Sequence, residues 1–211
     1  LLAHCVWLDD AEIQLLANHG VGVAHNPVSN MKLASGAAPI GAMLAKGIAV
    51  GLGTDGEKEN NNLDMFEELK TASLLAKHSN ADAAALDAWS ICRMATIDGA
   101  RALGMQETIG SLEVGKRADM IALNTHTPRM TPLITSGQYM NLQHNLVHAA
   151  QGGDVAMTMV DGQVLVRYGE LLCDDLSETI RAANRAIGPL LARRDAWIAS
   201  AGTAVNELEK S

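Results

Sequence analysis

The first quarter of the chain alternates short apolar runs with helical segments, and this alternation restricts the possible fold more than any other feature. Residues 1–6, 21–24 and 48–52 predict three short strands. Strands separated by helices pair in parallel through right-handed crossovers, so this part predicts an α/β fold. Each strand-to-strand step takes roughly 25 residues, which fits a compact unit of a (β/α)₈ barrel. An open, doubly wound sheet fits the same spacing.

Helix signals fill the segments between these strands. Asp9 and Glu12 have the spacing of a capping box, and Gly20 stands where a helix commonly ends. A second helix is predicted over residues 39–46. Further helices are predicted over residues 63–78, 84–96 and 98–103, with Glu67 and Glu68 on the surface of the first of these.

The pattern changes near Gly110. Residues 110–123 predict a glycine-turned hairpin that leads into a strand, and residues 155–168 predict a second hairpin around Asp161-Gly162. The tail over residues 176–199 returns to a helical pattern, which Gly188-Pro189 is expected to kink or divide.

Composition narrows the class of protein. Hydrophobic residues make up 48% of the 211 residues and charged residues 19%, which is enough for a packed core. The net charge of −8 gives no basic footprint for nucleic acid and no basic amphipathic segment for a membrane surface. Cys5, Cys92 and Cys173 are odd in number and widely spaced, which predicts a reduced, cytoplasmic location.

The opening residues, Leu1 to Val6, have the pattern of a buried strand already in progress, with no charged leader before it. We therefore expect the chain to be a fragment that lacks an upstream part. Such a fragment would leave an open sheet edge, so we expect it to be paired with the missing part or with a second copy.

Two polar residues stand where predicted strands end. His4 closes the first strand and Asp55 follows the third. Parallel barrels build their active sites at these carboxyl ends. An ionised Asp there can bind a divalent metal and accept a proton from the attacking water, while a nearby His can assist the same water or the developing oxyanion.

Each residue also has a structural interpretation. A single strand-end His commonly has a structural role, and Thr54-Asp55-Gly56 has the composition of a turn. His25 begins a turn near the same edge and is a candidate for the substrate pocket. His144 and His148 are four residues apart but lack the Glu of an H-E-x-x-H site, which favours a structural role.

Three motifs in this order together resemble one branch of a known family. They are residues 3–6 (AHCV), 24–36 (AHNPVSNMKLASG) and 51–56 (GLGTDG). Residues 60–68, 94–104 and 110–119 continue the match to about Leu172. The chain resembles the methylthioadenosine/S-adenosylhomocysteine deaminase branch of the amidohydrolases, and residues 94–119 equally resemble the triazine hydrolases.

This resemblance implies a distorted (β/α)₈ barrel that holds one divalent metal, zinc or iron, together with a small β-sandwich. Residues 1–105 would supply barrel strands and helices, residues 106–172 part of the sandwich, and residues 173–211 a helical tail. His4 falls at the family's strand-six histidine and Asp55 at its strand-eight aspartate, so both are candidate catalytic residues and metal ligands. The remaining family ligands, a His-x-His pair and a strand-five His, are not in this chain. The same resemblance implies that His144 and His148 lie in an extended segment.

The function that the resemblance implies is hydrolytic deamination of a purine nucleoside or related nitrogen heterocycle. The alternatives are a triazine-type hydrolase that expels chloride or an alkylamine, and an inert fragment that needs its amino-terminal part. Residues 57–59 (EKE), expected to form a loop that borders the pocket, replace the small residues that often follow Asp-Gly in the nucleoside deaminases. The expected partners are a small heterocyclic substrate, the missing amino-terminal part and further copies in a homo-oligomer.

Overall fold

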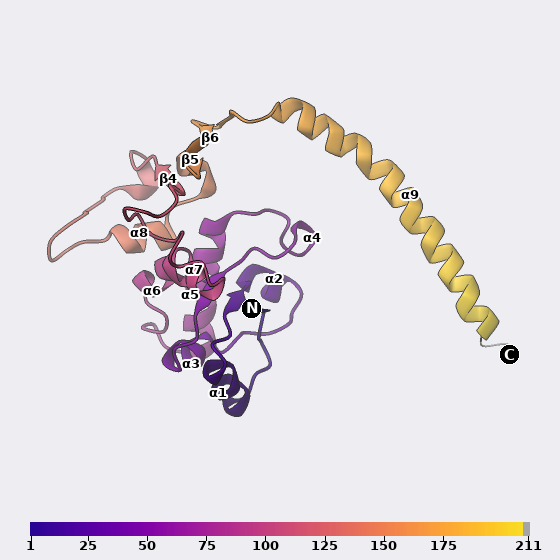
Figure 1. Cartoon of the computed structure of the whole chain (residues 1–211), viewed down its shortest axis with the longest axis horizontal. Helices are drawn as coiled ribbons and strands as arrows, with labels where there is room; N and C mark the ends of the chain where they lie inside the picture. The colour runs from indigo at the N-terminus through magenta and orange to yellow at the C-terminus, as the bar shows by residue number, and fades with distance from the viewer. Residues whose placement is uncertain (209–211) are drawn as a thin grey trace.

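Two sheets organise the chain, and a computed structural model describes them over residues 1–208, with side chains described as far as residue 200. The first sheet is parallel, in the order β1-β2-β3, and the second is antiparallel, in the order β4-β5-β6-β7 (Figure 1). The strands are β1 (Leu2–Ala3), β2 (Val23–His25), β3 (Val50–Leu52), β4 (Met120–Leu123), β5 (Val155–Val160), β6 (Gln163–Arg167) and β7 (Glu170–Leu171).

Helices surround the parallel sheet, and α3, α5, α6 and α7 contact β3. The helices are α1 (Asp10–Asn18), α2 (Pro27–Lys32), α3 (Ile40–Ala45), α4 (Glu57–Asn60), α5 (Met65–Asn80), α6 (Ala88–Met94), α7 (Ile97–Ala102), α8 (Leu142–His148) and α9 (Leu176–Leu208). Short 3₁₀ turns lie at Pro128–Met130 and Gly152–Asp154.

The predicted parallel α/β arrangement is confirmed for the three short strands. Val23 of β2 pairs with Leu2 on one side and with Val50 on the other. Two clusters of buried side chains form the core. The cluster at the sheet consists of Ile13, Val23, Ile40, Met43, Ile48, Val50 and Met94. The second cluster, to which α5, α6 and α8 contribute, consists of Phe66, Leu69, Ala88, Ile91, Met130, Val147 and Ala150.

The first strand differs from the prediction. It was expected to be buried over residues 1–6, but β1 contains two residues, and Leu1 and Leu2 are 64% and 44% exposed. The reason is its position at the edge of the sheet, where β2 is its paired neighbour. The sheet has three strands over the described residues, so closure into a barrel stays a prediction.

The capping box at α1 is confirmed. The Asp9 carboxylate accepts the Glu12 N–H at 2.8 Å, and the Glu12 carboxylate accepts the Asp9 N–H at 2.9 Å. These bonds satisfy two amide groups that the first helical turn leaves without a partner. The cap sets the start of α1 and so places Ile13, which is 2% exposed, in the core.

Three short helices were not predicted. The segment after His25 was interpreted as a turn, but Pro27 occupies the first position of α2, where its missing N–H costs nothing. Residues 57–59 were interpreted as a loop and form α4. His144 and His148, expected in an extended segment, lie on α8.

The second sheet confirms the hairpin around Asp161-Gly162. Both residues have positive φ, 50° and 80°, as expected for the tight turn that matches the twist of paired strands. The strand predicted after Gly110 is β4, but it pairs with β5, and residues 104–119 contain no strand, so the first hairpin is wrong. The strands β4 to β7 form one sheet, and a β-sandwich stays a prediction.

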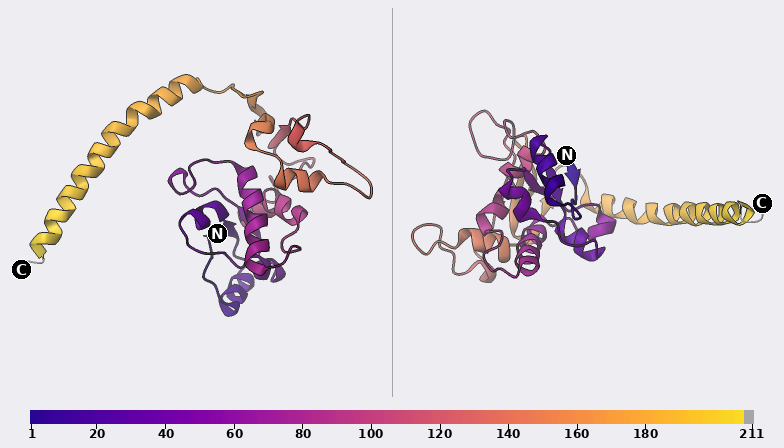
Figure 2. Two further views of the ribbon diagram at one scale, coloured as in Figure 1. Left: turned by 180° about the vertical axis from the view of Figure 1, so that it is seen from behind. Right: turned by 90° about the horizontal axis from the view of Figure 1, so that it is seen from below.

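The helical tail is one continuous helix over its described length. We expected Gly188-Pro189 to kink or divide it, but α9 continues through Pro189 as a gently curved arm that leaves the body of the molecule (Figures 1 and 2). Pro189 lacks the N–H that would bond to the carbonyl four residues earlier, and the helix accommodates this loss with a gentle bend. Residues 209–211 of the predicted tail lie outside the described residues.

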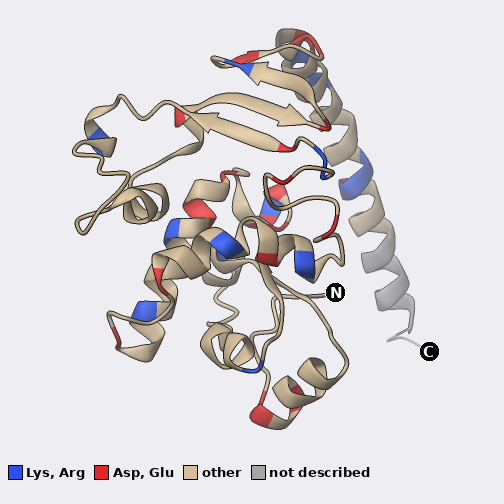
Figure 3. Ribbon diagram, turned by 60° about the vertical axis from the view of Figure 1, so that its left-hand side comes forward, with Lys and Arg blue, Asp and Glu red and all other residues tan. Residues whose placement is uncertain are grey.

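The surface carries charges of both signs. Lys and Arg are interspersed with Asp and Glu over the body and along α9 in the view of Figure 3. Nowhere in the described part of the chain does a helix combine the length and hydropathy that spanning a bilayer requires.

Close contact between β2 and α7 leads to a test of stability. A side chain at Gly22 would overlap the carbonyl oxygen of Ala102 and lie 2.6 Å from its Cα, both fixed backbone atoms. We expect Gly22→Ala to lower the free energy of unfolding by about 1–3 kcal/mol. The matched control is Gly41→Ala in α3, where a Cβ meets nothing within 4 Å and should stabilise by about 0.5–1 kcal/mol. Urea unfolding of both variants measures this, and equal effects would contradict the packing described here.

Candidate active site

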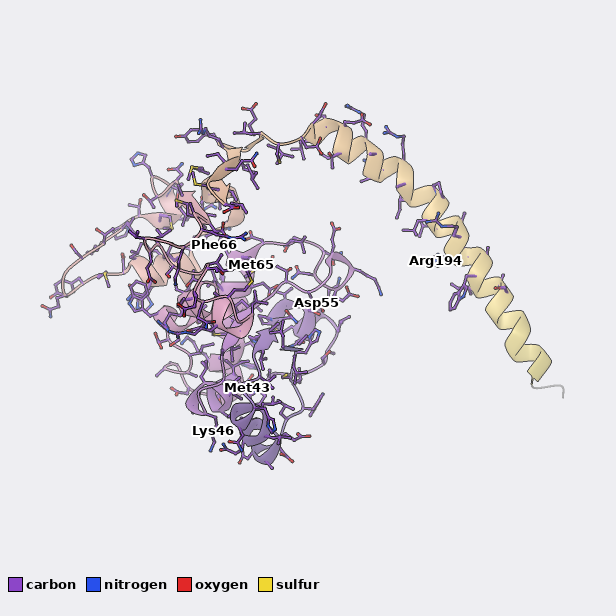
Figure 4. The ribbon with its side chains drawn as sticks, in the orientation of Figure 1. Met43, Lys46, Asp55, Met65, Phe66 and Arg194 are labelled. Carbon is purple, nitrogen blue, oxygen red and sulfur yellow. The ribbon has the colours of Figure 1, made fainter. Side chains whose placement is uncertain are left out.

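The structure brings the side chains of His4 and Asp55 together at the carboxyl ends of β1 and β3. His4 Nε2 lies 3.6 Å from Asp55 Oδ2. The two side chains are 40% and 26% exposed, so a ligand can reach them. Figure 4 shows Asp55, which follows β3, and Lys46, which precedes it, on different sides of the body. The pair therefore lies at the side where β3 ends. Their roles as ligands and catalytic groups stay predictions.

Both residues adopt a backbone conformation that is unfavourable for most side chains. His4 has φ 65° and Asp55 has φ 61°, in the left-handed region. Such residues cost of order 1–3 kcal/mol each and concentrate at functional sites. Two of them on facing side chains favour a functional interpretation of the pair over the structural one.

Asp55 is held as a carboxylate by two donors. The Ser29 hydroxyl donates to Oδ2 at 2.6 Å, and the Gly56 N–H donates to Oδ1 at 2.8 Å. These hydrogen bonds, Ser29 first, lower the pKa of Asp55, and the nearby His4 adds to the effect. The carboxylate is therefore ionised near neutral pH, which suits a metal ligand or proton acceptor.

His4 is anchored through its other ring nitrogen. Asn30 Oδ1 lies 2.8 Å from His4 Nδ1, and Asn26 Nδ2 lies 3.5 Å from the same atom. Asn30 is 1% exposed and comes from α2, as does Ser29. One short helix therefore contacts both members of the pair.

His25, the predicted pocket residue, ends β2 and is 2% exposed. Burial, followed by the charge of the neighbouring His4, lowers its pKa to about 4, so its ring is neutral at ordinary pH. Its Nδ1 has no hydrogen-bond partner among the described residues. Contact between His25 and a substrate stays a prediction.

The pair fits a divalent metal as two of its ligands. A separation of 3.6 Å is too long for a hydrogen bond but close to the spacing of two ligands that each lie about 2.0–2.2 Å from one zinc ion. No group of three His, Cys, Asp or Glu side chains with metal-binding geometry occurs among the residues described. Further ligands therefore have to come from outside this set.

Glu68 is a buried carboxyl group that sequence reasoning placed on the helix surface, and that prediction was wrong. It is 0% exposed, because its position on α5 shares a face with the buried Leu69 and Ala72. The spacing i, i+1, i+4 along the helix is the signal that could have shown it. Burial raises the pKa of Glu68 to about 7, although hydrogen bonds from Val28 and Asn60 partly oppose the rise.

Glu68 braces the segment that leads to Asp55. Its carboxylate accepts the Val28 N–H of α2 at 3.3 Å and the Asn60 side-chain amide at 2.5 Å. The same Asn60 amide donates to the carbonyl of Thr54 at 2.8 Å, one residue before Asp55. The brace therefore connects α5, α2 and the end of β3.

A mainly apolar hollow of about 520 Å³ lies elsewhere, between β2, β3 and residues 109–121. Neither His4 nor Asp55 lines it. We therefore assign the chemistry to the strand ends and not to this hollow.

Comparison with known proteins identifies relatives. A family model described as the amidohydrolase family matches residues 1–165. A 5'-deoxyadenosine deaminase of Methanosarcina acetivorans is 48% identical over 196 residues, which cover 93% of this chain and 44% of that protein. A 5-methylthioadenosine/S-adenosylhomocysteine deaminase of Desulforudis audaxviator is 47% identical, over 90% of this chain and 43% of its own length. The chain thus spans less than half the length of these relatives.

Solved structures are also similar. An adenosine deaminase from Xanthomonas campestris with bound zinc has a TM-score of 0.81 and 39% identity, and the match covers 88% of this chain and 41% of that one. An atrazine chlorohydrolase from Arthrobacter aurescens, complexed with zinc, has a TM-score of 0.76 and 29% identity over 87% of this chain and 39% of its own.

Proposed function

This chain belongs to the amidohydrolase family, and we propose that it is the carboxy-terminal part of a metal-dependent deaminase acting on a purine nucleoside or related nitrogen heterocycle. The family resemblance expected from the motifs is confirmed by the family model and by relatives named as deaminases. One observation carries the proposal: His4 and Asp55 face each other at 3.6 Å across two parallel strand ends.

His4 and Asp55 would hold one divalent ion, for which we propose zinc because similar structures contain it. When bound, such an ion makes a water molecule acidic enough to act as a nucleophile near neutral pH. The other ligands would come from a segment that completes the barrel. We call the protein that contains this segment and the present chain the complete enzyme.

In this proposal Asp55 moves the proton. The Gly56 N–H occupies one lone pair of Asp55 Oδ1 and leaves another to accept a proton from the attacking water, while Oδ2, which accepts the Ser29 hydroxyl, faces the ion site. Asp55 then donates this proton to the departing amine, so that water and the aminated ring carbon yield a carbonyl-containing ring and ammonia. His4 would hold the same ion through Nε2, whose lone pair faces Asp55 Oδ2, and would so place the attacking water beside the carboxylate.

A triazine-type hydrolase is the second candidate, because the similarity to a chlorohydrolase extends over the same residues. Chloride would then leave in place of ammonia, with the same two side chains. The third candidate is that this chain has no activity in isolation, because two side chains are too few to bind zinc tightly.

A substrate panel on the complete enzyme tests these candidates. The panel contains adenosine, methylthioadenosine, S-adenosylhomocysteine, guanine, melamine, atrazine and AMP, with ammonia and chloride release as readouts. We expect ammonia from the nucleosides and a roughly fivefold weaker response to AMP. Glu57 and Glu59 lie two and four residues after Asp55 and oppose a phosphate by about 1 kcal/mol per close pair in water. Lys58, whose Nζ lies 3.5 Å from Glu59, offsets one of these charges.

The isolated chain serves as the control for this experiment and should release no ammonia and retain no stoichiometric zinc. Chloride release from atrazine alone would support the triazine alternative. Turnover of no substrate by a zinc-loaded complete enzyme would reject the proposed function.

A further inference from the structure

We propose that Ser29 and Asn30 are positioning residues that set the two reacting side chains from one turn of α2: Ser29 orients Asp55, and Asn30 fixes which ring nitrogen of His4 carries the proton. This inference rests on the proposed function for its catalytic meaning. Its geometry and its principal test do not depend on turnover.

The two residues are consecutive and buried, with 0% and 1% exposure. Polar side chains at such positions are expected to hydrogen-bond, and these two bond outward to different strand ends instead of to their own helix. The Ser29 hydroxyl reaches Asp55 after β3, and the Asn30 amide reaches His4 after β1. Few other placements allow one short helix to control both sides of a site.

The Ser29 contact fixes the direction of the Asp55 carboxylate. At 2.6 Å it has the length of a charge-assisted hydrogen bond from a hydroxyl to a carboxylate. Because Gly56 N–H holds the other oxygen, the carboxylate plane is fixed at both ends. The remaining lone pair of Oδ2 is then available to the His4 side.

The Asn30 contact decides the tautomer of His4. Two amides approach His4 Nδ1: Asn30 through an accepting oxygen at 2.8 Å, and Asn26 through a donating nitrogen at 3.5 Å. The shorter contact has ideal hydrogen-bond length and the longer one is at the limit, so Nδ1 carries the hydrogen and donates to Asn30. The Asn26 oxygen in turn lies against Gly53, where a Cβ would overlap it.

The consequence is chemical. With its hydrogen on Nδ1, neutral His4 presents a bare nitrogen lone pair at Nε2, 3.6 Å from Asp55 Oδ2. Two electron-rich atoms that face each other in this way attract a cation. The other tautomer would place an N–H between them and favour a direct contact. Asn30 thereby prepares His4 as a ligand or proton acceptor and not as a donor.

The position of α2 is itself fixed. The Val28 N–H in its first turn donates to the buried Glu68, and the Asn30 carbonyl accepts the Ser35 N–H at 2.8 Å.

Asn30 Nδ2 has no protein partner among the described residues, so the amide is not optimised for stability alone. This favours a positioning role for Asn30.

The test is ¹⁵N NMR of the His4 ring in the metal-free complete enzyme, recorded over a pH series from which the spectrum of the neutral ring is taken. We expect hydrogen on Nδ1 in the parent and in Asn30→Asp, which keeps an accepting oxygen. Asn30→Leu, similar in size but unable to accept, should lose this preference. His19, whose Nδ1 contacts the Leu15 carbonyl on α1, is the internal control and should not change.

Zinc affinity gives the second readout. Asn30→Leu and Ser29→Ala should each bind zinc about 10–100-fold more weakly, while Asn30→Asp retains tight binding. Hydrogen on Nε2 in the parent, or an unchanged His4 tautomer in Asn30→Leu, would overturn the inference. The parent spectrum decides the tautomer even if Asn30→Leu does not fold. A correct tautomer without ammonia release would reject the proposed function and leave the positioning intact.

Discussion

Replacing Asp55 by asparagine is expected to reduce turnover by the complete enzyme about a thousandfold or more without unfolding it. An amide cannot accept the proton of the attacking water, and general acid–base groups contribute about 10²–10⁴-fold in rate. The side chain keeps an oxygen that can accept from Ser29 or Gly56, and asparagine tolerates the φ of 61° at this position. Steady-state ammonia release together with thermal unfolding measures both parts.

A matched control exists at Asp161, which also has a left-handed backbone, φ 50°, but lies in the β5–β6 turn. Asp161→Asn should keep full turnover. Turnover of Asp55→Asn within tenfold of the parent would remove Asp55 from its catalytic role. Equal losses in both variants would show that the effect comes from the backbone and not from the carboxylate.

The second large effect concerns stability and pH at Glu68. Its pKa of about 7 in the folded protein lies above the ordinary value of 4.5, so between these values the folded state holds a proton that the unfolded state releases. The associated stability is complete below pH 4.5 and is lost as the pH rises through about 7. Glu68→Gln stays neutral throughout. The free energy of unfolding of Glu68→Gln minus that of the parent should therefore increase by up to about 3 kcal/mol from about pH 4.5 to pH 8.

Glu67→Gln is the control for this experiment, since Glu67 is the preceding residue on α5 and is exposed. It should keep most of the pH dependence of the parent, because the charge of Glu67 is a minor cause of the raised pKa of Glu68. His25 titrates in the opposite sense, losing stability as the pH falls from 6.5 through about 4, but it is present in every variant and cancels in the difference. A pH-independent difference for Glu68→Gln would show that Glu68 is not the titrating group.

The sequence predicted the parts of the fold that local chemistry specifies. The capping box at Asp9, the Asp161-Gly162 turn and the second and third apolar strands each depend on a few neighbouring residues, and all are confirmed. The meeting of His4 and Asp55 could also be expected, because parallel strands bring their carboxyl ends to one edge. The barrel itself stays a prediction, since the described sheet contains three of its strands.

The features that sequence reasoning missed depend on tertiary contacts. Pro27 looked like a turn because nothing local shows that the following residues continue as a helix. Ser29 and Asn30 were read as part of a motif, but their partners lie 26 residues away in opposite directions along the chain. Glu68 was assigned to a solvated face because carboxylates are seldom buried, but hydrogen bonds from Val28 of α2 and Asn60 of α4 accompany its burial.

The left-handed backbone at Asp55 also determines how mutation can affect the gene. Aspartate codons become asparagine or glycine codons by one nucleotide change, and both new residues accept this conformation. Under the proposed catalytic role of Asp55, these two replacements would remove the chemistry and spare the fold. Quality control that recognises misfolded protein would not detect them. Under that role, natural selection for aspartate at this position would act through the reaction and not through folding.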